Sequence, residues 1–181
     1  MRNIILMSGL LLALTSCGNK SSSYAEEIKT IDSLLVLVTD MQAGIDSVSM
    51  DTVSMYSAVV KEKMNVLKSR YPDTTDREFW VLEMGVFAKV DRGLSKFKSN
   101  APNIMAGLKT SEKQLRTLRN SLEDNKLDSA EVKSYMKVET NEFLAVQHQF
   151  YRRQRVALSA LELYPYALAH MDSIIATLPE Q

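Results

Sequence analysis

Few side chains in this sequence are of the kinds that bind transition metals or act as nucleophiles: there is one cysteine, Cys17, and there are two histidines, His148 and His170. A di-iron helical bundle uses Glu-x-x-His pairs, but Ala145 and Ala167 stand three residues before the histidines. The sequence also lacks the zinc-protease, c-type haem, dinucleotide-binding and phosphate-loop motifs. We therefore expect no enzyme activity, no metal site and no cofactor.

Haem held between a methionine and a histidine is the cofactor alternative that this composition leaves open. Met136 and Met171 fall at positions expected to face a helical core, and His148 lies between two glutamines. Methionine at such positions more often fills gaps in a core, and a histidine among glutamines is more often a surface residue. A purified protein without a Soret absorption band would exclude haem.

The densest group of charges is the stretch YRRQR at 151–155, and no acidic residue occurs in 143–161. Pairing with an acid three or four residues away on the same helix is therefore impossible for the central arginines. They must meet acids on another helix, face solvent, or bind an anionic lipid headgroup, cell-wall carboxylate or partner protein. The candidate binding surface consists of Tyr151, Arg152, Arg153 and Arg155.

A polar layer is predicted inside the core, where Thr52, Asp91 and Arg153 would lie at similar heights if the chain runs up, down and up again. A buried arginine needs an anionic partner. The hypothesis is an ion pair between Arg153 and Asp91. The alternative is that the aliphatic part of Arg153 covers apolar surface while its guanidinium reaches water.

The environment of the single cysteine indicates how the protein is located. Arg2 is followed by an apolar run at 4–14, which is too short to span a bilayer, since a spanning helix needs about 20 residues. Such a run after a positive charge is typical of an export signal. The four residues Leu14, Thr15, Ser16 and Cys17 resemble the bacterial lipobox. That resemblance implies cleavage after residue 16 and acylation of Cys17.

Two or more acyl chains on one residue hold a protein stably at a membrane, and residues 17–24 would form a flexible tether. Gly18 stands where an aspartate would favour the inner membrane, so the resemblance implies the outer membrane. The layout is similar to small all-helical Bacteroidetes lipoproteins of unknown function, whose acidic surface-export tag is missing here before Glu26. We therefore expect the domain to face the periplasm. The alternative is a cleaved secretory signal that leaves Cys17 unmodified.

Charge and composition limit which partners and which fold class are expected for the rest of the chain. Without residues 1–16 it carries 21 basic and 22 acidic residues, and this near-neutral balance argues against a nucleic-acid partner. Only six glycines and four prolines occur in the whole sequence, which favours helices. We expect one all-α domain over 25–181.

Apolar residues recur at alternating steps of three and four over two long stretches, as in helices that pack along their length. The first stretch, 31–66, predicts a single helix that continues through Gly44, with apolar positions at Ile31, Leu34, Val38, Met41, Ile45, Val48, Met55, Val59 and Val66. The second, 132–178, keeps one frame through Pro165, which favours a kink there over a stop. Its apolar positions are Val132, Met136, Phe143, Val146, Phe150, Ala157, Ala160, Tyr164, Ala167, Met171, Ile174 and Leu178.

The middle stretch is less regular: its frame includes Val86 and slips by one residue near 91–94. A helix could start again at 100–102, where Asn100 would be the N-cap and Pro102 would lie in the first turn. Capping boxes are predicted at Thr75 with Glu78 and at Asp128 with Glu131. Segments 25–70, 75–124 and 128–178 then predict an elongated antiparallel bundle of three long, kinked helices. If the breaks near Gly44, Pro102 or Pro165 are corners, the alternative is a compact bundle of four to six helices.

These patterns build helix surfaces and assemble no reacting centre. We therefore expect a membrane-anchored, non-enzymatic helical scaffold or binding module for another cell-envelope component. The alternative is a small-ligand carrier or enzyme, with an apolar pocket near the helix kinks lined by Trp80, Phe97 or Tyr164.

Overall fold

The computed structural model describes residues 23–179, which form helices and no strands. The elements are α1 (Ala25–Asp46), α2 (Met50–Arg70), a six-residue π-helix η1 (Glu78–Glu83), α3 (Met84–Glu123) and α4 (Ser129–Thr177). The all-α prediction is confirmed. The described residues hold four α-helices rather than the three expected, because the first predicted segment is divided in two.

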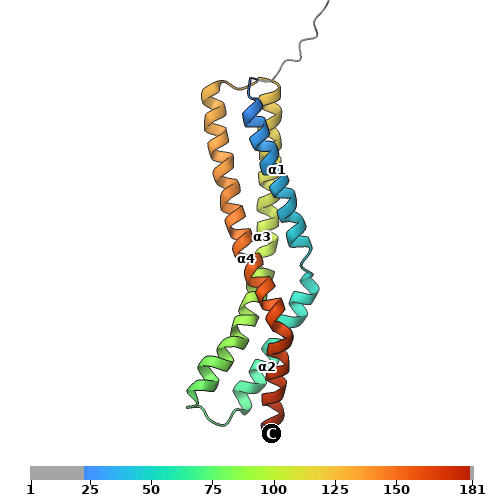
Figure 1. Cartoon of the computed structure of the whole chain (residues 1–181), viewed down its shortest axis with the longest axis vertical. Coiled ribbons are helices and arrows are strands. Elements are labelled where there is room, and N and C mark those ends of the chain that lie inside the picture. Colours follow the sequence, from blue (N-terminus) through green and yellow to red (C-terminus); the bar gives the residue numbers. More distant parts are fainter. Residues whose placement is uncertain (1–22, 180–181) are drawn as a thin grey trace, which may run out of the picture.

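The helices lie along one long axis, and α4 runs almost its full length (Figure 1). The 49 residues of α4 correspond to about 70 Å at 1.5 Å per residue. In the upper half of the view, α1 packs beside the end of α3 and the start of α4; in the lower half, α2 packs beside the start of α3 and the end of α4 (Figure 1). α1 and α2 therefore follow one another along the same side of the α3–α4 pair.

The predicted frame of the last segment matches the burial of α4. All eight buried residues of this helix occupy predicted positions: Val132, Phe143, Phe150, Ala157, Ala160, Tyr164, Ala167 and Met171. Pro165 lies inside α4, and Pro102 lies inside α3, so neither proline is a corner. Buried neighbours on both sides of each proline hold these helices in place, because packing of an apolar face outweighs local propensity.

The prediction of an unbroken helix through 31–66 is wrong. α1 ends at Asp46 and α2 starts at Met50, and the side chain of Ser49 caps α2 by accepting a hydrogen bond from the Thr52 amide. Serine favours such caps because its hydroxyl satisfies a free amide of the first turn. The break shifts the frame by one residue, so Val53 is buried whereas Met55 is 57% exposed.

The irregularity of the middle segment lies earlier than predicted. From Phe87 to Leu122 the buried positions of α3 other than Gly93 alternate at steps of three and four without a slip. The extra residue is absorbed instead in η1, because a π-helix is wider than an α-helix. Phe87 is fully buried as a result, and the predicted Val86 is 46% exposed. Asn100 starts no helix; its amide donates to the Lys96 carbonyl within α3.

The α2–η1 connection is held by a small polar and aromatic cluster. Asp76, rather than the predicted Thr75, caps the start of the helix that begins with η1. One Asp76 carboxylate oxygen accepts from the Phe79 amide, and the other accepts from the Tyr71 hydroxyl at 2.6 Å. These hydrogen bonds hold the pKa of Asp76 below its usual value and raise that of Tyr71 to about 12. Tyr71 stacks on Phe79, and the Trp80 indole donates to the Asp73 carbonyl at 2.9 Å.

The α3–α4 connection uses standard helix-end chemistry, and the Asp128–Glu131 capping box is confirmed. Asn125 has a φ of 51°, and the Lys126 amide donates back to the Ser121 carbonyl, which closes the end of α3. The Tyr24 hydroxyl donates to the Leu127 carbonyl, so the start of α1 lies against this turn.

A single apolar core continues through both halves of the bundle. At mid-length α4 crosses α3 (Figure 1). The crossing is close because small residues meet there: a Cβ added to Gly93 would lie 2.7 Å from the Ala160 Cβ and 3.1 Å from the Val156 carbonyl oxygen.

Candidate functional site

The residue with the clearest expected role, Cys17, lies outside the described residues, as do the predicted signal 1–16 and most of the tether 17–24. The structure locates only the other end of that tether, because Tyr24 sits beside the α3–α4 turn. Of the helices in 23–179, none has a stretch long and apolar enough to cross a bilayer.

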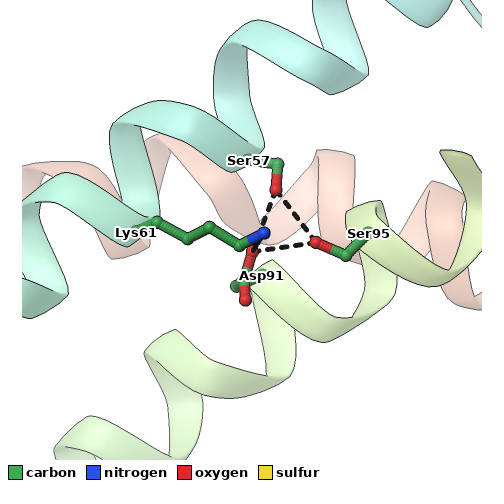
Figure 2. A network of polar contacts seen from close by, with 4 residues as sticks. All are labelled: Ser57, Lys61, Asp91 and Ser95. Atoms are coloured by element: carbon green, nitrogen blue, oxygen red, sulfur yellow. Dashed lines mark hydrogen bonds and ion pairs between the residues drawn. The ribbon is translucent and has the colours of Figure 1, made fainter.

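A polar network does exist around Asp91 of α3, where this helix contacts α2 (Figure 2). One Asp91 carboxylate oxygen accepts from the Ser57 hydroxyl at 2.9 Å and the Ser95 hydroxyl at 3.1 Å, and Lys61 Nζ lies 3.8 Å away. Ser57 is only 5% exposed, and the Ser57 and Ser95 hydroxyls are 3.0 Å apart. The network therefore joins α2 to α3 and satisfies a hydroxyl buried in the core.

Two of the three residues predicted for the polar layer do not bond to Asp91. The Thr52 hydroxyl bonds to Ser49 at the start of α2. Arg153 is half-buried on α4, and within 23–179 it forms no ion pair with Asp91. The expected Arg153–Asp91 contact is therefore replaced by serine and lysine partners from α2 and α3. The sequence reasoning missed them because the frame shift at 47–49 moved Ser57 onto the core face.

The predicted basic surface divides over two sides of α4. Arg152 and Arg155 are exposed, and residues three apart share a helix face. Arg153 is half-buried on the core-facing frame. We call the solvent-facing side the arginine face; it is an open hollow along α4 lined by His148, Tyr151, Arg152, Gln154, Arg155, Leu158, Ser159 and Glu162.

The arginine face is not neutralised by ion pairs within 23–179. Two arginines of α3 do find acids: Arg119 binds Asp32 of α1 and Glu123, and Arg116 binds Glu112. No such pair involves Arg152 or Arg155 in the described chain. The only acid that lines the hollow is Glu162, at its far end. A neighbouring hollow between α3 and α4 adds Lys89 beside Arg155, which extends the basic surface.

A second groove, of about 770 Å³, lies between the upper parts of α3 and α4 and is lined in part by Lys109, Lys113, Tyr135 and Glu139. Burial raises the pKa of Glu139, and the nearby Glu142 raises it further. Sequence reasoning did not find this groove, because its residues are ordinary surface types that are brought together only by the spacing of the two helices.

The aromatic residues expected to line a carrier pocket pack against other side chains. Phe97 is buried in the core, and Tyr164 stacks on Tyr56 with ring centroids 3.6 Å apart. Trp80 lies at the α2–η1 connection with Tyr71 and Phe79.

The residues weighed for haem or metal chemistry are spread over the molecule. Met171 is fully buried, Met136 is half-buried, and His148 is exposed. The His170 ring lies 2.7 Å from a Glu83 carboxylate oxygen. Among residues 23–179, no three histidine, cysteine or acidic side chains gather as a metal site would require.

Fold and surface together define an all-α helical bundle with a packed core and a basic, partly apolar exposed helix face. Comparison of the chain with models of protein families, with curated proteins and with solved structures gives no significant match. The surface of this chain is therefore the only available indication of its function.

Proposed function

We propose that this protein is a lipid-anchored, periplasm-facing lipoprotein that acts as a non-enzymatic helical binding module for another cell-envelope component. Its acyl chains on Cys17 would hold it at the outer membrane. In this proposal the bundle works as three antiparallel rods with bends near Pro102 and Pro165, the first rod being α1 followed by α2.

The single observation that carries the binding role is the arginine face. Arg152 and Arg155 are exposed, lie side by side on one helix, and have no ion-pair partner among the described residues. Water solvates exposed charges well, so each arginine alone costs little stability. Two adjacent cations without local acids nevertheless repel each other. An anionic partner would relieve that repulsion, so this surface is the best-supported contact site.

A small-ligand carrier is the second candidate function, and the groove beside Glu139 is the observation that favours it. It lies away from Pro102 and Pro165, where sequence reasoning placed a pocket. The continuous apolar core supports the binding module over the carrier, because a carrier of apolar ligands needs enclosed space.

Crosslinking in intact cells tests the binding module. Cells that produce the full chain are treated with a lysine-reactive crosslinker, and three forms are compared: wild type, Arg152→Glu with Arg155→Glu, and Lys133→Glu with Lys137→Glu. The last pair lies on the same helix, is exposed and has no ion pair within 23–179, so it matches the charge change.

We expect one reproducible adduct with an envelope component in the wild type and in the lysine control, and its loss in the arginine variant. Circular dichroism should show equal helix content in all three. No adduct in any form, or equal adducts in all three, would contradict the proposed role of the arginine face.

A further inference from the structure

We propose that the arginine face docks an acidic amphipathic helix of an envelope protein, which lies lengthwise along α4. This inference rests on the proposed binding function and adds to it the chemistry and geometry of the partner.

The first support is an apolar stripe along the same face. Leu144, Tyr151 and Leu158 are 47%, 51% and 49% exposed, and they follow one another at intervals of seven residues. A spacing of seven keeps side chains on one line of a helix and is the repeat by which a second helix packs. The stripe extends over 14 residue steps, or about 21 Å, which is about four turns of a partner helix.

The stripe lies on the solvent side of α4, beside residues that already pack inward. Each of its members directly follows a fully or almost fully buried residue: Phe143, Phe150 and Ala157. α4 therefore carries one apolar seam for its own core and a second, weaker seam to the outside. The second seam has no partner helix among the described elements.

Charge selects the kind of helix. Arg152 and Arg155 flank Tyr151 and Leu158, and stretch 143–161 contains no acid. A partner with glutamates or aspartates beside its apolar residues would match this arrangement, as flanking charges set partner choice in helical pairs. A second copy docked through the same face would bring its own arginines against these, so the occupant is a different protein.

Position along the rod favours a protein over lipid headgroups. The start of α1 and the α3–α4 turn share one end of the bundle. Arg152 lies 23 residues into α4, or about 35 Å from that end. With the rod upright on its proposed anchor, the arginine face therefore stands clear of the membrane surface.

Position-specific photocrosslinking in cells tests this inference. A photoreactive amino acid replaces Leu144, Tyr151 or Leu158 in the full chain, one at a time. Tyr135 is the control, because it is 46% exposed on the same helix but lies nine residues before Leu144, about half a turn round the helix. The crosslinked peptides are identified by mass spectrometry.

We expect all three stripe positions to label one protein, within one segment, at sites that shift by about seven residues for each step along the stripe. The segment should carry acids beside its apolar positions, and Arg152→Glu with Arg155→Glu should reduce labelling at least tenfold. Tyr135 should not label it. Adducts with phospholipid, with a second copy of this chain, or with an unpatterned or basic segment would each overturn the inference.

The two proposals fail separately. If the lysine-reactive crosslinker still captures an envelope component while all three stripe positions remain unlabelled, the binding module stands and the helix-docking inference is wrong. If neither method captures a component, both are wrong.

Discussion

The close crossing of α3 and α4 at Gly93 makes Gly93→Ala a sharp test of the packing. The new methyl carbon would lie 2.7 Å from the Ala160 Cβ, about 1 Å closer than carbon atoms at their optimal separation. It would also lie 3.1 Å from the backbone oxygen of Val156, which is held in α4. Overpacking of this kind costs about 1–3 kcal/mol, whereas replacing a helical glycine by alanine contributes about 0.5–1 kcal/mol of stability.

Gly85→Ala supplies the matched control, because it lies in the same helix and an added Cβ would meet nothing within 4 Å. The control should gain the full propensity term, so the two variants should differ in unfolding free energy by about 1–3 kcal/mol. For a chain of this size that difference corresponds to about 2–12 °C in Tm. Thermal unfolding followed by circular dichroism at 222 nm measures it. A Gly93→Ala variant as stable as Gly85→Ala would refute the close crossing.

Three further changes probe the polar contacts. The pKa of Asp76 lies below its usual 3.8, so its hydrogen bonds contribute stability at neutral pH and are lost only as pH falls below 3.8. The fluorescence of Trp80, the only tryptophan, should change as the pH falls below 3.8. Asp76→Asn should show the altered emission already at pH 7. Asp91→Ala leaves the buried Ser57 hydroxyl without its acceptor on Asp91 and should lower the unfolding free energy in urea by about 1–3 kcal/mol, with a smaller loss for Asp91→Asn. Asp128→Ala removes the cap of α4 and should cost about 1 kcal/mol, read as a lower Tm; an unchanged Tm would contradict the capping role.

Burial on α4 could be predicted from sequence because the helix is continuous and its frame needs no correction over 49 residues. Even Pro165 leaves the frame intact, since the core-facing residues on either side of it, Tyr164 and Ala167, are buried. Periodicity was reliable here because one physical rule, apolar residues every 3.5 positions, applied without interruption.

The first and middle segments show where periodicity fails. A three-residue break at 47–49 and a π-helix at 78–83 each shift the frame by one residue, and apolar residues stand at both old and new positions. Met55 and Val86 fit the predicted frame, and Val53 and Phe87 fit the shifted frame equally well. Only packing against α3 and α4 decides which of them is buried.

The candidate site was predictable in part for the same reason. The arginines of α4 could be identified from the absence of nearby acids, which is a property of the sequence itself. Their division between a solvent side and a core side follows from helix geometry. The partners of Asp91 could not be predicted, because Ser57 and Lys61 reach it only after the shift in α2.

We propose a helical module held at a membrane by lipid on Cys17, and the mass of the mature N-terminus shows whether that lipid is present. The full-length protein is purified from the membranes of its native cells, digested, and its N-terminal peptide measured by mass spectrometry. We expect a peptide that begins at Cys17 and carries a diacylglycerol on the sulfur, with or without a third acyl chain on the amine. A peptide that retains residues before Cys17, or an unacylated Cys17, would contradict it.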